Sequence, residues 1–244
     1  MNILGLKTIS HIDDIKFLGE MKNLIFLNDD TRPVWSGIGY AKTNIDAHMP
    51  YAKWANEHWA LYFGFIHNIS LNNKRMLDLG CGVGFNTINL CGIGDESKII
   101  GYDIDKEIID FSNKYNKNDD IIYINENIID RKFQEGMDYV FLIETLEHIK
   151  HTHHYNLIDN CLNSLKDDNS RLFISTPNEQ QFSNKERGHV GILTNKFFEL
   201  FKKRYKQNIV SVEYYDNKKL VSHDVSEYTT TNHQHSHYKI IMKK

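Results

Sequence analysis

The fold of this chain is decided by one stretch, Arg75-Met-Leu-Asp-Leu-Gly80-Cys-Gly82-Val-Gly84-Phe-Asn-Thr-Ile-Asn-Leu90. Its first residues form a short, mostly apolar run that predicts a buried parallel strand. Three alternating glycines follow, and apolar residues then recur at helical spacing. A strand, a glycine-rich turn and a helix N-terminus in this order predict a ligand site. Glycine lets the backbone approach a ligand, and the unpaired N–H groups of the helix start point at it.

The spacing of these glycines restricts the ligand. A dinucleotide-binding turn places its third glycine three residues after the second. In this chain that position holds Phe85, and the third glycine comes one residue earlier, while Asp78 stands two places before the first glycine. The pattern therefore disfavours a nicotinamide dinucleotide. An ordinary strand-to-helix turn without a ligand is the competing interpretation.

Length and composition set the outer limits. A chain of 244 residues with 41% hydrophobic content predicts one compact domain, and its net charge of -3 disfavours nucleic acid as a partner. The 3 cysteines lack metal-site spacing and indicate structural thiols in a reducing compartment. With no leader-like start and no apolar run of membrane length, we expect a soluble cytoplasmic protein without membrane insertion.

The chain is expected to have an N-terminal helical segment over residues 1–69, followed by the ligand-binding domain over residues 70–244. A helix is predicted over residues 50–67, because apolar and aromatic residues recur there on one stripe: Tyr51, Ala55, Trp59, Tyr62 and Ile66. This segment is interpreted either as packed core or as a lid over the site.

Polar side chains follow the predicted strands. Asp103 ends the second strand, residues 98–103, at about the twenty-residue offset where a doubly wound fold places a carboxylate on a ribose. A helix-capping aspartate is the alternative. The third strand, residues 121–124, leads into Asn127. The fourth, residues 138–143, runs directly into Glu144-Thr-Leu-Glu147-His148.

Three titratable groups in five positions at a strand end indicate function. Two functional interpretations remain open. His148 is a general base for a substrate hydroxyl, oriented by Glu147, or Glu144, Glu147 and His148 bind a divalent cation. A solvated helix start is the third possibility. Two further groups of histidines, at positions 151, 153 and 154 and at positions 233, 235 and 237, are expected to be exposed and without function.

A fifth strand over residues 171–175 and two strand-like runs over residues 209–215 and 238–242 complete the pattern. The predicted fold class is α/β, a Rossmann-like doubly wound, seven-stranded, mainly parallel sheet with an antiparallel edge strand. A helix over residues 194–205 carries several lysines, which are interpreted as a solvated face.

The glycine loop, Asp103, the Glu-x-x-Glu-His sequence and Ser-Thr-Pro-Asn178, in this order at strand ends, resemble the class I S-adenosylmethionine (SAM) methyltransferases. The resemblance implies SAM as cofactor. It also implies a set of cofactor-binding residues: Asp78, Gly80, Cys81, Gly82, Asn86, Asp103, Ile104, Asn127 and Ile143. Family members usually carry an acid where Asn127 stands, and an asparagine can still accept a hydrogen bond from adenine through its side-chain oxygen.

Within this family the Glu-x-x-Glu-His sequence resembles two subgroups. One contains the ubiquinone-pathway O-methyltransferases and related small-molecule and glycan methyltransferases. The other contains the small-RNA 3′-terminal 2′-O-methyltransferases, which bind a divalent cation. In this chain the resemblance implies a site for Mg, Mn or Zn with the ligands Glu144, Glu147, His148 and His189. We expect methylation of a hydroxyl on a small molecule or glycan. The alternatives are metal-dependent RNA 2′-O-methylation, N-methylation of an amino sugar, and SAM binding without catalysis.

Overall fold

The computed structural model describes Tyr62, Phe65, Ile66 and residues 68–116, 118–177, 189–191, 195–215, 223–224 and 237–244. The chain divides into two compact units. The first unit comprises Met1–Lys74 and Cys81–Glu126, and the second comprises Arg75–Gly80 and Asn127–Lys244. The N-terminal segment and lid predicted over residues 1–69 fall almost wholly outside the described residues. Tyr62 and Ile66, two members of the predicted stripe, are helical and buried.

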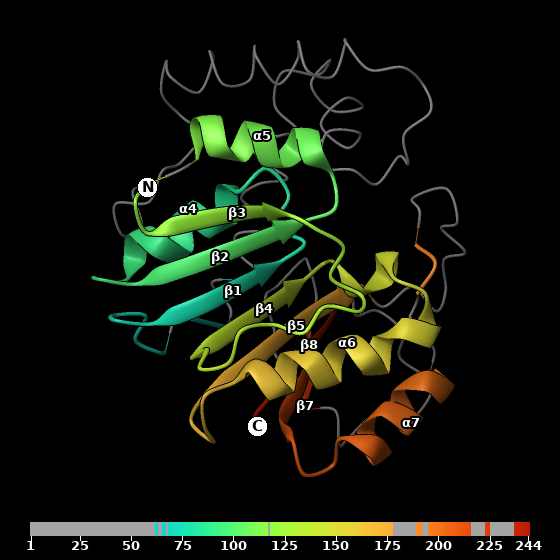
Figure 1. The fold of residues 1–244 in the computed structure, drawn as a ribbon. Helices are drawn as coiled ribbons and strands as arrows, with labels where there is room; N and C mark the ends of the chain where they lie inside the picture. Colours follow the sequence, from blue (N-terminus) through green and yellow to red (C-terminus); the bar gives the residue numbers. More distant parts are fainter. Residues whose placement is uncertain are drawn as a thin grey trace. The chain divides into compact units, whose positions relative to one another are not determined.

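The first unit is a βαβ arrangement that follows the glycine loop. The loop runs into α4 (Phe85–Ile93), and β2 (Lys98–Asp103) is connected through α5 (Lys106–Tyr115) to β3 (Ile121–Asn125). The strands β2 and β3 pair in parallel, and α5 lies beside them (Figure 1). Asp105 caps α5, since its Oδ1 accepts the N–H of Glu107 at 2.9 Å. The helix-capping role considered for Asp103 therefore belongs to Asp105.

The second unit contains the parallel strands β1 (Arg75–Leu79), β4 (Tyr139–Ile143) and β5 (Arg171–Pro177). β4 pairs with β1 on one side and β5 on the other, and all five of its residues are buried. This explains why its sequence is continuously apolar rather than alternating. The rings of Phe141 and Phe173 stack across the β4–β5 pair at 5.1 Å, so the core of this unit lies directly beneath the strand ends that carry the polar residues.

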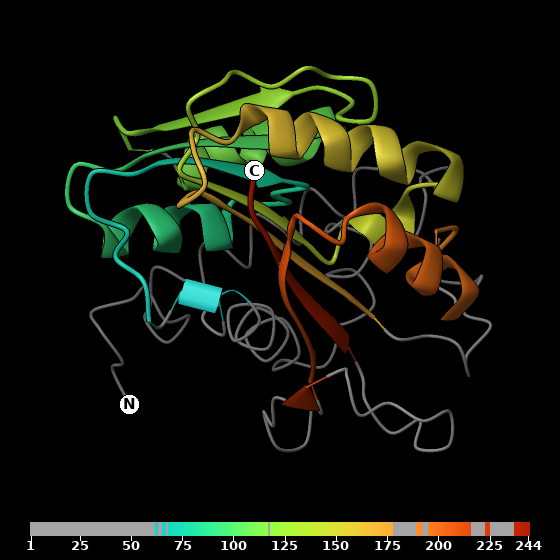
Figure 2. The same cartoon turned by 90° about the horizontal axis from the view of Figure 1, so that it is seen from below.

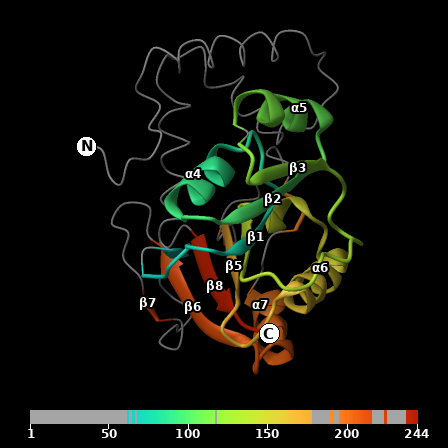
Figure 3. The same ribbon diagram turned by 60° about the vertical axis from the view of Figure 1, so that its left-hand side comes forward.

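Three antiparallel strands extend the sheet beyond β5. β8 (His237–Met242) pairs with β5, β6 (Ile209–Tyr215) pairs with β8, and the two-residue β7 (His223–Asp224) pairs with β6 (Figure 3). The described residues thus hold eight strands, and the arrangement confirms the predicted mainly parallel sheet with an antiparallel edge. β7 is a short addition at that edge.

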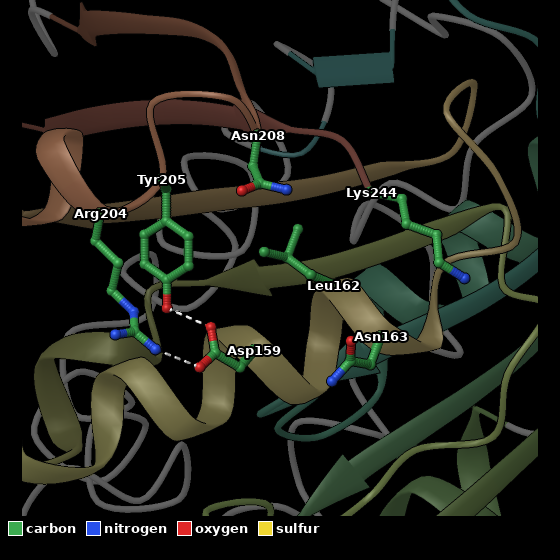
Figure 4. Close-up of a pocket in the computed structure, with 7 residues that line it drawn as sticks. All are labelled: Asp159, Leu162, Asn163, Arg204, Tyr205, Asn208 and Lys244. Carbon is green, nitrogen blue, oxygen red and sulfur yellow. Dashed lines mark hydrogen bonds and ion pairs between the residues drawn. The ribbon is translucent and has the colours of Figure 1, made fainter.

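Helices α6 (His151–Ser164) and α7 (Asn195–Arg204) lie side by side in the second unit (Figures 1 and 2). One apolar face of α6 and the residue that follows the helix are buried: Leu157, Ile158, Cys161, Leu162 and Leu165. Asp159 of α6 accepts hydrogen bonds from Arg204 at 2.7 Å and from the Tyr205 hydroxyl at 2.8 Å (Figure 4). These three residues also line the hollow at this point, so part of its polar lining is already engaged in hydrogen bonds. No helix among the described residues is long and apolar enough to cross a bilayer.

Candidate active site

The glycine loop of the first unit adopts a backbone that only glycine adopts easily. Gly82 and Gly84 have φ of 55° and 75°, in the left-handed region. A side chain at Gly84 would overlap the hydroxyl of Tyr123, whereas a Cβ at Gly82 would meet nothing within 4 Å. The backbone at Gly82 is therefore open to a ligand, while Gly84 is required by close packing.

Side chains that the sequence did not single out hold this loop in shape. Ser112, Asn116 and Tyr123 donate hydrogen bonds to three consecutive loop carbonyls, at 3.2, 2.6 and 3.2 Å. Ser112 and Asn116 lie one helical turn apart, at the end of the helix that follows Asp103. That spacing of polar residues on an otherwise apolar face is the signal that could have identified them.

Asp103 is bonded directly to the glycine loop. Its Oδ2 accepts the N–H of Gly82 at 3.0 Å, and its Oδ1 accepts the N–H of Asp105 at 2.9 Å. Burial raises the pKa of the Asp103 carboxyl, and these two N–H donors oppose the rise. The adjacent Ile104 is 52% exposed, which is unusual for a large apolar side chain beside a polar cluster.

Two more of the predicted cofactor residues lie in this unit. Asn86 stands in the first turn of α4, and its Oδ1 is buried without a hydrogen-bond partner among the described residues. A buried amide oxygen of this kind is unusual, which makes it a candidate acceptor for a ligand. Cys81 is buried, and its N–H donates to the carbonyl of Tyr102 at 2.9 Å, which ties the start of the loop to β2.

The remaining predicted cofactor residues belong to the second unit. Asp78 is fully buried within β1, and Gly80 has a φ of 76° and contacts Thr145 so closely that a side chain would overlap it. The Ile143 side chain is buried, which leaves only its backbone for a ligand. Asn127 is exposed, and its Oδ1 already accepts the N–H of Ile129 at 3.0 Å. This bond uses one of the two lone pairs of that oxygen.

The two carboxylates after β4 are held by consecutive residues of β5. Ser175 donates from its hydroxyl to Glu144 Oε1 at 2.8 Å, and Thr176 donates to Glu147 Oε2 at 3.1 Å. Because successive side chains of a strand point to opposite faces, the two glutamates are directed to different sides of the sheet. Glu147 is buried, and Thr176 lies opposite Tyr238, which stacks on Phe198 of α7.

The spacing of three residues between Glu144 and Glu147 would place both on one face of a helical turn, but the structure does not have this arrangement. Glu144 has a φ of 51° and lies outside any helix, whereas the 3₁₀ helix η1 begins two residues later and spans Leu146–His148. The left-handed backbone of Glu144 changes the direction of the chain before Glu147. The physical reason is the register of β5, which periodicity within residues 144–148 does not reveal.

Glu147, His148 and His189 form the cluster at this site. Each offers a ligand atom, and these atoms lie within 4.8 Å of one another. The imidazole rings of His148 and His189 meet edge to face, with centroids 4.8 Å apart and planes at 77°. Three of the four predicted cation ligands are thus brought together, and Glu144 is not among them.

His154 corrects another expectation, since it is completely buried rather than exposed. Its Nε2 lies 2.9 Å from the carbonyl oxygen of Leu146 and 2.6 Å from that of Ile149. Burial lowers the pKa of His154 to about 4, although these hydrogen bonds oppose the shift. His154 is therefore a neutral ring at neutral pH. His233 and His235 lie outside the described residues.

A mainly parallel sheet, with a glycine loop after its first strand and acidic residues at later strand ends, defines the class I SAM-dependent methyltransferase fold. A family model described as a methyltransferase domain matches residues 51–238. The chain therefore belongs to this family of methyltransferases.

Two curated relatives match parts of the chain. The ubiquinone biosynthesis O-methyltransferase of Glaesserella parasuis is 28% identical over 116 residues, which cover 44% of this chain and 47% of that protein. Ribosomal RNA small subunit methyltransferase A of Mesomycoplasma hyopneumoniae is 36% identical over 70 residues, or 28% of this chain and 26% of that protein. The chain thus spans about half of one relative and a quarter of the other.

Solved structures show the same fold at low identity. The PH0226 protein of Pyrococcus horikoshii has a TM-score of 0.58 and 15% identity, with coverage of 87% of this chain and 96% of that chain. The N-methyltransferase NodS of Bradyrhizobium japonicum, in complex with S-adenosyl-L-homocysteine, has a TM-score of 0.56 and 13% identity. Its match covers 93% of this chain and 98% of that chain.

Proposed function

We propose that this protein transfers the methyl group of SAM to a hydroxyl of a small molecule or glycan. The observation that carries the proposal is the group Glu147, His148 and His189, whose potential proton-accepting and metal-binding atoms lie within 4.8 Å of one another. A hydroxyl is a poor nucleophile at neutral pH and needs a base or a cation to take its proton. An amine acceptor needs only to be neutral and aligned.

The first unit supports the proposed binding of the cofactor. Gly82 presents open backbone, and the buried Asn86 Oδ1 is available as an acceptor. We assign the ribose hydroxyls to the carboxylate of Asp103, which can accept from both of them. Ile104, which is largely exposed beside it, offers an apolar surface for the adenine ring. Cys81 shapes the loop through its backbone.

The second unit contributes four residues to the same proposal. Asn127 offers the second lone pair of its Oδ1 to the adenine amino group. Gly80 directly follows β1 and Ile143 ends β4, and we assign the backbone of both residues to the methionine part of the cofactor. Asp78 is assigned a supporting role because its side chain is fully buried.

Bound SAM supplies an electrophilic methyl group on a sulfonium. His148 accepts the proton of the acceptor hydroxyl as its oxygen forms a bond to the methyl carbon and the sulfur–carbon bond breaks. The products are a methyl ether, S-adenosylhomocysteine and a protonated His148. Thr176 fixes the Glu147 carboxylate at 3.1 Å, so this carboxylate can orient the imidazole and stabilise its charge.

An acceptor screen with isotopically labelled SAM tests the proposal. Small hydroxylated aromatics and sugars are offered in parallel with amines, short RNA and no acceptor. We expect label to appear in a hydroxyl-bearing product. Transfer only to amines, or SAM binding without transfer to any class, contradicts it.

A second candidate mechanism is favoured by the same three residues. One carboxylate and two imidazoles form a ligand set that suits Mn²⁺, Fe²⁺ or Zn²⁺ better than Mg²⁺. A cation there would lower the pKa of the acceptor hydroxyl and make a separate base unnecessary. Running the acceptor screen after EDTA treatment and again with added Mn²⁺ separates the two mechanisms, because only the metal-dependent one is abolished and restored.

RNA 2′-O-methylation is the alternative acceptor class that this metal mechanism would serve. The curated relative that acts on ribosomal RNA covers only 28% of the chain, and the net charge of -3 gives the chain no overall attraction for phosphate. Binding of a labelled short RNA, measured between low and physiological salt, distinguishes it. Affinity that falls steeply with salt supports RNA, because phosphate contacts release counterions.

A reducing, cytoplasmic setting is the last part of the proposal. All three cysteines, Cys81, Cys91 and Cys161, are buried thiols, and burial raises the pKa of Cys91 and Cys161. Such thiols are poorly reactive and have structural roles.

A further inference from the structure

The chain segment that carries His189 is docked on the backbone of η1. The N–H groups of Val190 and Gly191 both donate to the carbonyl oxygen of Glu147, at 2.9 and 2.8 Å. One acceptor thus holds two consecutive donors, and it belongs to the residue between β4 and His148. The positions of His148 and His189 are coupled through this backbone contact rather than through their rings alone.

A buried histidine holds the other carbonyls of the same turn. His154 Nε2 is shared between Leu146 O at 2.9 Å and Ile149 O at 2.6 Å, the residues on either side of Glu147 and His148. Both partners only accept, so Nε2 must carry the hydrogen. The ring is completely buried and packs edge-on against Phe197 of α7 at 5.3 Å. His154 of α6 is therefore hydrogen-bonded to the backbone at both ends of η1, and we call this contact the His154 clamp.

Because Gly191 has no side chain, the segment that carries His189 can approach the His154 clamp closely. A side chain there would overlap the carbonyl oxygen of Ile149, and it would also lie 2.6 Å from His154 Nε2 and 2.8 Å from Leu146 O. The obstacles are mostly backbone atoms of a turn fixed at both ends, which cannot move aside as a flexible side chain can. Any larger residue must push the segment away from Glu147.

We propose that His154 and Gly191 are positioning residues that fix His148 and His189 at the separation needed for methyl transfer. His154 holds the turn that carries His148, and Gly191 permits the close approach of the segment that carries His189. Neither residue is among those assigned to the cofactor, the proton transfer or the cation. The inference rests on the proposed function, and its structural half is measurable without turnover.

The experiment compares His154→Phe, which keeps an aromatic ring without a donor, with His154→Gln, which restores an N–H at similar reach. Gly191→Ala tests the second residue, and His153→Phe on the same helix is the matched control. Each full-length variant is measured for melting temperature, for affinity for S-adenosylhomocysteine, for kcat, and for amide exchange of Val190 and Gly191.

We expect His154→Phe and Gly191→Ala to lower kcat about 10- to 100-fold, because small misplacements of reacting groups cost this much. Cofactor affinity should stay within about 2-fold, which is less than about 0.5 kcal/mol, because neither residue is among those assigned to the cofactor. Amide exchange of Val190 and Gly191 should accelerate, while His154→Gln recovers most of both properties and His153→Phe changes neither.

Two results overturn the inference. One is faster exchange in folded His154→Phe or Gly191→Ala without loss of kcat, and the other is unchanged exchange in both. If one variant does not fold, the other decides. If the wild-type protein transfers no methyl group, the proposed function fails and so does the catalytic part of the inference. Faster exchange in the variants would then still establish the clamp as a structural contact.

Discussion

Gly82 and Asp103 are joined by a hydrogen bond of 3.0 Å from the backbone N–H of the glycine to Oδ2 of the aspartate. The residue proposed to bind the ribose therefore also fixes the loop proposed to lie along the cofactor. Its second oxygen is engaged by Asp105 at 2.9 Å, so both oxygens are oriented by the backbone. Preorganisation of this kind lowers the cost of ordering the site when a ligand binds.

Asp103→Ala should weaken binding of SAM or S-adenosylhomocysteine by about 10- to 100-fold. The change removes the charge-assisted hydrogen bonds to the ribose, which together should contribute about 1.5–3 kcal/mol, and leaves the Gly82 N–H without its acceptor. Calorimetry measures the affinity. Asp105→Ala is the control, because it removes the cap of α5 and should cost about 1 kcal/mol of stability with little change in affinity. Unchanged affinity in folded Asp103→Ala refutes the assignment.

Gly82→Ala and Gly84→Ala should differ in effect. Both replacements strain a left-handed residue by about 1–2 kcal/mol. Only Gly84→Ala also overlaps Tyr123, so it should lower the melting temperature further. Gly82→Ala should instead chiefly reduce cofactor affinity, because its Cβ projects into open space beside the backbone. If the Gly82→Ala and Gly84→Ala variants have the same melting temperature and the same cofactor affinity, the proposed contact at Gly82 is contradicted.

His148→Ala should lower kcat by about 10²–10⁴ if the imidazole is the general base, with cofactor affinity unchanged. His148 lies in η1 and is not among the residues assigned to the ribose and adenine. Steady-state kinetics on the identified acceptor and calorimetry with S-adenosylhomocysteine give the two quantities. Near-normal turnover in a folded variant eliminates His148 as the base.

Cation binding should depend on His189 and be independent of Glu144. Glu144 is directed to a different sheet face by Ser175, so Glu144→Gln should keep the wild-type affinity for Mn²⁺. His189→Ala removes one of the three grouped ligands and should lower that affinity at least about 10-fold. Titration calorimetry with Mn²⁺ decides. Equal losses in both variants, or no heat with the wild type, remove the metal mechanism and leave His148 as a metal-free base.

Protein stability should fall as the pH drops below about 6.5. His154 has an ordinary pKa of 6.5, lowered to about 4 in the folded chain chiefly by burial, with His151 and His153 adding charge repulsion. Between these values the unfolded chain binds the extra proton, so the free energy of unfolding decreases with decreasing pH. The loss reaches about 3 kcal/mol below pH 4 and is absent above pH 6.5.

Denaturant unfolding between pH 4 and 7 measures this effect, and His154→Gln is the reference without a titrating ring. The unfolding free energy of the wild type should fall relative to that of the variant as the pH is lowered. A difference that is independent of pH shows that His154 is not held neutral.

The sequence predicted the elements well because their signals are local. The five parallel strands begin and end close to the predicted residues, and the buried faces of α6 and α7 follow the apolar periodicity. The places of the glycine turn and of Asp103 in the fold also agree with the sequence, because a turn with left-handed glycines and an acid at the end of the next strand are both encoded by neighbouring residues. Their hydrogen bond, however, joins positions 21 residues apart.

The features that the sequence did not predict depend on distant segments. The sequence indicated that Glu144 and Glu147 bind the same cation, but in the structure they bind consecutive residues of β5. Nothing near residues 144–147 encodes the register of β5 that determines this. His154 looked like one of several surface histidines. Its burial follows from two carbonyls of the preceding turn and from Phe197 on α7.

Ser175 and Thr176 are consecutive in β5, so their hydroxyls point to opposite faces of the sheet, and each binds a different glutamate. Each hydroxyl selects one carboxylate, so the side of the sheet to which a glutamate is assigned depends on whether its partner occupies an odd or an even place along β5. An insertion of a single residue earlier in this strand would turn both hydroxyls to the opposite faces and would break both of these hydrogen bonds without changing the composition of the site.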